Sequence, residues 1–185
     1  MNTATLIPAM DPVRHSRLLA DLEGVSETAH IPQQYILHSM KTLCTPSDIE
    51  WVINFRKYRQ DGVAGLILSG KDVGSRSMAI GGALLRNFID ARIVTAKDLY
   101  NSGTEGKGHA SEDVLKPTVI IVPNLFVESS GKALASWQVQ AMYDVLITRF
   151  AANKPTVVGV ESLLQLGSAY GSMFMEHLES NFKKS

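Results

Sequence analysis

From residue 64 onward, short apolar runs alternate with stretches of helical periodicity. The runs "TVIIV" and "TVVGV" are apolar throughout and rich in β-branched residues, as expected of strands covered on both faces. Strands are predicted at 64–69, 91–95, 118–122 and 156–160, and helices at 77–89, 96–100, 136–152 and 168–183. This alternation is typical of an α/β fold with a mainly parallel sheet.

The first 30 residues have a weaker pattern. Apolar Val13, Leu18, Leu19 and Leu22 recur at roughly helical spacing, which predicts a short amphipathic helix over 13–22. Proline residues before it interrupt any regular element. We therefore expect an N-terminal arm at 1–30, followed by one globular domain at 31–185.

A second helix is predicted by "SDIEWVINFRKYRQDG", residues 47–62. Ser47 and Asp48 are candidate caps, and Glu50 would complete a capping box with Ser47. The same segment clusters Arg56, Lys57 and Arg59 next to aromatic residues. Such a cluster can contact phosphates, but a solvated helix face explains it as well and is the interpretation that we favour.

The composition is that of one globular domain. With 185 residues, 45% of them hydrophobic and 19% charged, the chain can bury a substantial core. Its formal net charge is zero, so no overall field attracts nucleic acid or an anionic membrane. The single cysteine excludes an intramolecular disulfide. No apolar run approaches the roughly 20 residues of a membrane span, and we expect a soluble, cytoplasmic protein.

Two further groups of residues have ordinary explanations. His109 lies near Glu105, Glu112 and Asp113 in a glycine-rich loop, but the spacing fits no metal site. Trp137 and Tyr143 are expected to pack their helix against the sheet. The run Met173, Phe174 and Met175 is expected to be core or a contact with another subunit.

The stretch "GLILSGKDVGSRSMAIGGALL", residues 65–85, has the outline of a phosphate-binding loop. Against the pattern G-x-x-x-x-G-K-[ST], Gly70 and Ser77 fit, but Ser75 replaces the second glycine and Arg76 replaces the lysine. Gly74 supplies part of the cradle, and the helix dipole would favour an anion. A guanidinium is bulkier than an ammonium, so the loop alone leaves nucleotide binding and a purely structural turn both open.

Six segments occur along the chain in a characteristic order, and the second of them begins the candidate loop: "HIPQQY", "GLILSG", "ARIVTAKDLYN", "VIIVPNLF", "YDVLITRFAANKPTVVGV" and "AYGSMFMEHL". In order and spacing they resemble the AAA+ domain of the bacterial helicase loader DnaC and its transposition relative IstB, over roughly residues 30 to 180. The resemblance implies a three-layer α/β P-loop NTPase of the AAA+ type. It also implies ATP or ADP with Mg²⁺ as cofactors, and a replicative helicase, a helicase loader or another AAA+ subunit as partner.

The chain departs from this family at the positions that would carry catalysis. Pro123 and Asn124 stand where a strand should end in two acids that hold magnesium. Glu161 replaces a polar sensor and would repel a γ-phosphate. Glu176 and His177 fall where a serine and the arginine finger are expected, and a mostly neutral histidine is a weak substitute. A finger alone contributes about 10³ to 10⁵ in rate, so we expect negligible hydrolysis.

These departures favour a hydrolysis-deficient adaptor or regulator in DNA replication or mobile-element biology. One alternative is a switch that holds ATP or ADP through Gly70, Gly74, Ser75, Arg76 and Ser77 without turnover. Another is an active ATP-dependent loader with atypical motifs. A structural subunit of a larger complex is a further possibility, because a fold alone does not fix a function.

Overall fold

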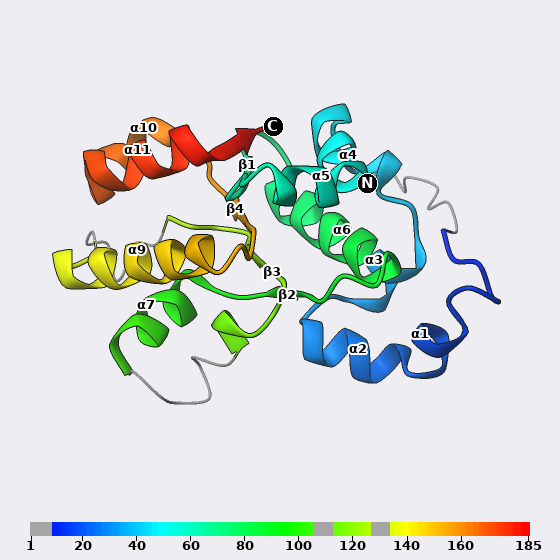
Figure 1. Cartoon of the computed structure of the whole chain (residues 1–185). Helices are drawn as coiled ribbons and strands as arrows, with labels where there is room; N and C mark the ends of the chain where they lie inside the picture. Colours follow the sequence, from blue (N-terminus) through cyan, green and yellow to red (C-terminus); the bar gives the residue numbers. More distant parts are fainter. Residues whose placement is uncertain (1–8, 106–112, 127–133) are drawn as a thin grey trace.

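A five-stranded parallel sheet forms the centre of the computed structural model, within the residues that it describes, 9–105, 113–126 and 134–185 (Figure 1). The strand order is β2-β3-β4-β1-β5, and every neighbouring pair is parallel. The strands are β1 (Gly65–Leu68), β2 (Ala91–Ile93), β3 (Val119–Val122), β4 (Thr156–Gly159) and β5 (Phe182–Lys184). The predicted α/β class with a mainly parallel sheet is confirmed, and each of the predicted strands lies in this sheet.

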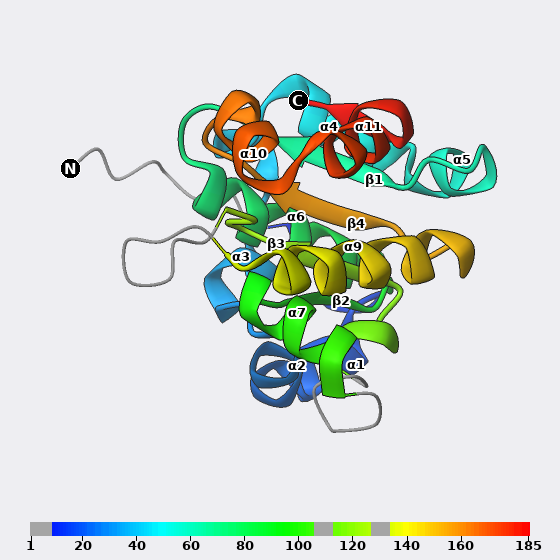
Figure 2. The ribbon, with the colours of Figure 1, turned by 90° about the vertical axis from the view of Figure 1, so that its left-hand side faces the viewer.

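Helices cover both faces of the sheet and so make three layers (Figures 1 and 2). On one face lie α1 (Ser16–Ala20), α2 (Leu22–Ala29), α3 (Gln33–Leu37), the 3₁₀ turn η1 (Met40–Thr42), α4 (Pro46–Ile53), α5 (Phe55–Gln60) and α6 (Val73–Arg86). On the other lie α7 (Ala96–Glu105), α9 (Ser136–Ala151), α10 (Leu163–Tyr170) and α11 (Ser172–Asn181). Among the described residues, no helix combines the length and apolarity that a bilayer crossing requires.

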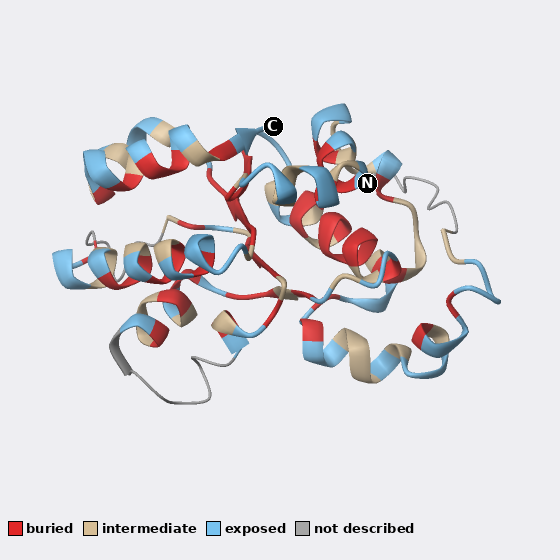
Figure 3. Ribbon diagram, viewed as in Figure 1, coloured by how far each residue is buried: buried red, intermediate tan, exposed pale blue. Residues whose placement is uncertain are grey.

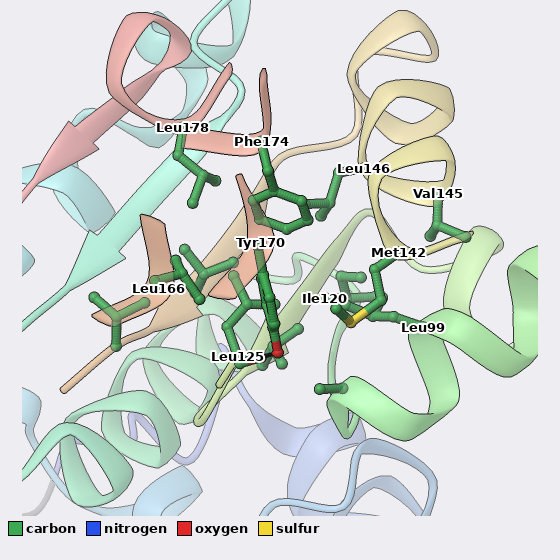
Figure 4. Packing of buried hydrophobic residues seen from close by; sticks show 14 of the residues in the cluster. Leu99, Ile120, Leu125, Met142, Val145, Leu146, Leu166, Tyr170, Phe174 and Leu178 are labelled. Carbon is green, nitrogen blue, oxygen red and sulfur yellow. Dashed lines mark hydrogen bonds between the residues drawn. The ribbon is translucent and has the colours of Figure 1, made fainter. Parts of the chain in front are cut away.

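Buried apolar side chains form a separate cluster on each face of the sheet. Figure 3 shows that the strands are buried and that helices on both sides carry buried residues. Along β3 the side chains alternate between the two clusters. Ile120 and Val122 belong to the cluster on the α9 side, shown in Figure 4, whereas Val119 and Ile121 belong to the cluster on the α6 side. This alternation is the period of two that a strand imposes, and it explains why the strand sequences are apolar at every position.

Helix α6 packs closely on α3 and on the residues just before α3, because two residues of α6 are glycines without a side chain. A Cβ on Gly82 would lie 2.0 Å from the carbonyl oxygen of Tyr35, and a Cβ on Gly81 would lie 2.5 Å from Cδ1 of Ile31. Any larger residue would push α3 away from α6. The "IPQQY" segment is thereby fixed against the helix that follows the candidate phosphate-binding loop.

The predicted helix over 47–62 is wrong in its continuity and in its cap. It is broken at Asn54 into α4 and α5. The N-cap is Thr45 rather than Ser47, and Asp48 rather than Glu50 completes the capping box. Pro46 begins the helix, where its missing N–H group costs nothing.

Other helix predictions also needed correction. The predicted short helix over 13–22 is confirmed at Ser16–Ala20 as α1, but it is shorter than predicted, and the sequence pattern does not indicate α2, which begins at Leu22. The predicted helix over 168–183 is interrupted at Gly171, whose φ is +86°, and gives way to strand β5. Trp137 does not pack against the sheet: it is 58% exposed and meets Tyr100 of α7 edge-on.

Candidate functional site

Residues 69–77 comprise the turn between β1 and α6 and the first residues of α6, and they lie at the carboxyl edge of the sheet, as a phosphate-binding loop does. Their course differs from that of a loop, because α6 begins at Val73 and not at 77 as predicted. Gly70 has a φ of +86° and Asp72 a φ of +56°, so the chain turns at these two residues. The N–H group of Arg76 already bonds to the carbonyl of Asp72, at 2.9 Å. Gly74, Ser75 and Arg76 are therefore helical residues rather than loop residues.

The side chain of Arg76 is buried and forms an ion pair with Asp48 of α4. Its Nε lies 2.8 Å from Oδ2 of Asp48, and one Nη lies 3.0 Å from Oδ1. The same Nη donates to Oγ of Ser185 at 2.9 Å, and the other Nη donates to the carbonyl of Ser69 at 2.6 Å. These bonds use four of the five N–H donors of a guanidinium. The positive charge at the lysine position is thus directed into the protein.

Asp48 is fully buried and saturated with hydrogen bonds. Besides Arg76, it accepts from the N–H of Thr45 at 2.8 Å and from Oγ of Ser185 at 2.7 Å. Burial by itself would raise the pKa of this carboxyl, but the hydrogen bonds from Arg76, Ser185 and Thr45 outweigh it and hold the pKa below its usual value. Both charges of the pair are therefore present at neutral pH and cancel one another.

Local sequence explains the position of Asp48, and the sheet explains the position of Ser185. The capping box of α4 places the carboxylate of Asp48 near the first turn of its own helix. Strand β5 runs beside β1, so Ser185 reaches the end of β1, where its N–H bonds to the carbonyl of Ile67 and its carbonyl accepts from Ser69. We define Asp48, Arg76, Ser185 and Thr45 as the Arg76 clasp.

The other residues at the start of α6 lie close to the Arg76 clasp, but they do not form an open phosphate-binding cradle with Arg76. Ser77 is fully buried, and its Oγ has no hydrogen-bond partner in the described part of the chain. Ser75 is half-buried and Gly74 is exposed. A Cβ on Gly159 would lie 2.5 Å from Cγ1 of Val73, so the start of α6 packs over the end of β4. The hydroxyl that would bind magnesium is enclosed rather than presented at a surface.

The neighbouring strands end without the groups that Mg²⁺ and ATP require. Half-buried Pro123 and exposed Asn124 follow β3, and Oδ1 of Asn124 accepts from the N–H of Phe126, at 3.1 Å, within the same turn. Exposed Glu161 follows β4. A neutral amide is a poor ligand for a hard cation, and Arg76 is held by Asp48. The residues of this edge therefore do not fit Mg²⁺–ATP.

His177, at the finger position, lies in the core and not on a surface. Its ring meets those of Tyr143, Phe150 and Phe182 edge-on, and its Nε2 has no hydrogen-bond partner in the described residues. Burial lowers the pKa of this imidazole. A neutral, enclosed ring on α11 cannot reach into a neighbouring subunit, while Glu176 beside it is exposed.

The predictions for the polar cluster around His109 fall largely outside the described residues. This holds for His109 and Glu112 and for the side chain of Glu105. Asp113 is described and forms an ion pair with Arg92. Within the described segments, no group of His, Cys, Asp and Glu side chains could hold a metal ion.

Sequence reasoning missed the Arg76 clasp. The sequence pattern indicates Asp48 only as a helix cap, and it gives no sign of Ser185. The distance along the chain is the reason: Arg76 is separated by 28 residues from Asp48 and by 109 from Ser185. The one local signal was the substitution of lysine by arginine, since a planar guanidinium suits a bidentate carboxylate partner.

Comparison with solved structures identifies the fold. A crystal structure of the DnaC helicase loader matches with a TM-score of 0.59 and 18% identity, over 75% of this chain and 84% of that one. The replication initiator DnaA bound to AMPPCP and single-stranded DNA matches with a TM-score of 0.57 and 11% identity. AMPPCP-bound DnaA from Aquifex aeolicus matches with a TM-score of 0.53 and 10% identity. Each DnaA match covers 79% of this chain and 49% of the DnaA chain, so this chain spans about half of their length.

No protein-family model matches the sequence, and no curated protein matches it. The structural similarity nevertheless confirms the expected fold, which is a DnaC-like AAA+ P-loop fold. At these identities the likeness is one of fold.

Proposed function

We propose that this chain is a hydrolysis-deficient relative of the helicase loaders, which acts as a protein-interaction adaptor or regulator in DNA replication or mobile-element biology. The observation that carries the proposal is the ion pair between Arg76 and Asp48, at 2.8 Å and buried. It uses the side chain at the position of the catalytic lysine to hold the protein together. The fold shared with the DnaC helicase loader supports the biological setting.

The chemistry of phosphoryl transfer supports the loss of hydrolysis. Catalysis depends on cations that neutralise the charge developing on the phosphate, and on a residue that orients the attacking water. At the expected positions this chain has a guanidinium paired with Asp48, Pro123 and Asn124 after β3, and the enclosed ring of His177. Each change removes a separate contribution, so their combination leaves no route to appreciable turnover.

Exposed apolar side chains support a protein partner. Leu164 of α10 is 86% exposed, Met173 of α11 is 53% exposed, and Trp137 of α9 is also exposed. Large apolar side chains on adjacent elements are typical of surfaces that meet other proteins. The partner class that we propose is a replicative helicase, a helicase loader or another AAA+ subunit, encountered in the cytoplasm. The zero net charge gives no support for nucleic acid as the main partner.

A pull-down tests the adaptor role. The tagged chain is incubated with the replicative helicase and with its loader, each purified, and the retained protein is quantified. We expect one of the two to be retained, and Leu164→Asp to reduce its retention. Gln33→Asp, at an exposed position of α3 on the other face of the sheet, serves as the control of charge. Retention of neither protein would contradict the proposal.

A nucleotide-binding switch without turnover is the second candidate. Two observations favour it: the side chain of Asp72 makes no cap to the first N–H groups of α6, and buried Oγ of Ser77 has no partner in the described residues. The DnaA structures that share the fold hold AMPPCP. Calorimetry with Mg²⁺–ATP distinguishes the two functions. Heat that Ser77→Ala removes would favour the switch, whereas no heat at millimolar nucleotide would favour the adaptor.

The third alternative, an active ATP-dependent loader, is tested by steady-state phosphate release. Measurable ATP turnover in the presence of single-stranded DNA would favour the active loader over the hydrolysis-deficient adaptor.

A further inference from the structure

A pocket of about 400 Å³ lies at the amino edge of the sheet, opposite the Arg76 clasp. We call it the amino-edge pocket; it is lined by Phe55, Arg56, Arg59, Gln60, Phe88, Ile89, Thr118 and Asn153. These residues come from the ends of α5, α6 and α9 and from the segment before β3. Helices that cross back over a parallel sheet end at this edge, so residues from separate segments converge on it. The volume lies within the range of small-molecule sites.

The side chains that line the pocket carry positive charge without an acidic counterpart. None of the described residues that line it is acidic. Nε of Arg59 donates to the carbonyl of Asn153 at 2.9 Å, which fixes the guanidinium. Within the described residues, no side-chain hydrogen bond or ion pair involves its terminal nitrogens or the side chain of Arg56. Helix carboxyl ends carry partial negative charge, and α5, α6 and α9 all end near this pocket. The positive charges of Arg56 and Arg59 oppose it.

Phe88 is an exposed aromatic residue on a left-handed backbone. It is 60% exposed and has a φ of +58°, at the position after α6 where glycine is the usual residue. The ring stacks on buried His15, with centroids 5.7 Å apart, and the guanidinium of Arg14 lies 6.0 Å from its centroid. Glycine would fit this backbone with less strain, and residues that keep such strain are found at ligand sites.

We propose that the amino-edge pocket binds a nucleoside phosphate, with the base stacked on Phe88 and the phosphate held by Arg56 and Arg59. Guanidinium groups recognise phosphate through paired hydrogen bonds, and bases stack on aromatic side chains irrespective of their identity. The amides of Gln60 and Asn153 and the hydroxyl of Thr118 offer donors and acceptors to the edge of a base. A free mononucleotide and a single strand both carry this chemistry.

This site is independent of the proposed function, because it shares no residue with the turn between β1 and α6. The proposal can therefore fail while the adaptor role stands, and the reverse also holds. Binding is measured with the full chain by calorimetry, using AMP, adenosine and inorganic phosphate separately. A fluorescein-labelled oligothymidylate, followed by polarisation, identifies a single strand as the source.

The variants separate ligand binding from folding. Arg56→Ala is exposed and is expected to weaken AMP binding roughly tenfold, because a charge-assisted hydrogen bond is lost. Phe88→Gly is expected to weaken it roughly tenfold while the melting temperature stays the same or rises, since glycine relieves the strained φ. Lys57→Ala is the matched control: Lys57 lies on the same helix but pairs with Asp61 at 2.5 Å and does not line the pocket.

The proposal predicts that AMP binds more tightly than adenosine or phosphate, and that the affinity falls as the salt concentration rises. Tighter binding of the oligonucleotide than of AMP would assign the site to single strands, and the reverse would assign it to free nucleotides. The proposal is overturned if AMP and the oligonucleotide both fail to bind at millimolar concentration. It is also overturned if Arg56→Ala and Lys57→Ala act alike, or if a phosphotyrosine peptide binds where both nucleotide probes do not.

Discussion

The two edges of the sheet use arginine in opposite ways. At the carboxyl edge, Arg76 is 4% exposed and its guanidinium is shared among Asp48, Ser185 and the carbonyl of Ser69. At the amino edge, Arg56 and Arg59 line an open pocket, and none of the described residues that line it is acidic. The edge that resembles a nucleotide site by sequence therefore has its arginine enclosed. The opposite edge has no such motif, and there the side chain of Arg56 has no hydrogen bond or ion pair to the described residues.

The difference between the edges lies in the partner and not in the residue type. A buried carboxylate turns an arginine into a structural connection between α4, α6 and the end of β5. Removing one member of such a pair is costly, because the other charge stays buried without compensation. Arg56, for which the described residues provide no side-chain hydrogen bond or ion pair, keeps its donors for a ligand. Substituting the partner of a charged residue should accordingly change the stability of the protein only where that partner is buried with it.

The largest expected effect is that of Asp48→Ala. It leaves Arg76 buried without its counterion, and we expect the free energy of unfolding to fall by about 3–5 kcal/mol. Urea denaturation followed by circular dichroism measures it. Asp61→Ala is the matched control, because Asp61 pairs with Lys57 at an exposed site and little change is expected there. Equal losses in the two variants would contradict the structural role of the clasp.

Arg76→Lys should have a smaller effect. Lysine keeps the charge but not the planar fork that bonds both oxygens of Asp48. We expect a loss of about 1.5–3 kcal/mol in the free energy of unfolding, from the hydrogen bonds to a charged group. Restoring the lysine should not restore ATP turnover, since Pro123 and Asn124 still follow β3. A stable variant that hydrolyses ATP would contradict this, because it would show that Pro123 and Asn124 do not prevent turnover.

The smallest effect concerns pH and His177. Burial holds the pKa of this imidazole below 6.5 in the folded protein. The unfolded chain therefore binds more protons as the pH falls below 6.5, and the contribution of His177 to stability is lost from there toward the lowered pKa. Urea denaturation over this range should show the slope, and His177→Leu should flatten it. An unchanged slope in the variant would assign the effect to other groups.

Asp48 changes its protonation at a lower pH than His177 does. Its pKa is held below 3.8, so its contribution is present above 3.8 and is lost only as the pH falls toward the lowered pKa. The two groups can therefore be distinguished in one pH series, with His177→Leu removing the slope nearer neutrality alone.

The fold could be predicted because its signals are local. The apolar runs of β3 and β4 are buried on both faces, so composition alone identified them as strands. Strand β5 was missed because "FKK" is mostly polar and pairs with β1 on one side. The break of α4 and α5 at Asn54 and the cap at Thr45 depend on backbone geometry that the helical period does not carry.

The candidate site was predictable in part. The positions of Gly70, Pro123 and Glu161 at one edge follow from the parallel sheet, whose strands all end there. The orientation of Arg76 does not, since it is set by Asp48 and Ser185 from distant segments. Likewise, no periodicity indicates that His177 lies against the aromatic rings of Tyr143, Phe150 and Phe182.

The most direct test of the account is a steady-state phosphate-release assay on the full chain with Mg²⁺–ATP, with and without single-stranded DNA. The account predicts no release above that of the protein-free reaction, because Arg76 is held by Asp48 and no acid follows β3. Magnesium-dependent release that Arg76→Ala abolishes would contradict it, since the guanidinium would then have to leave the clasp and act on the nucleotide.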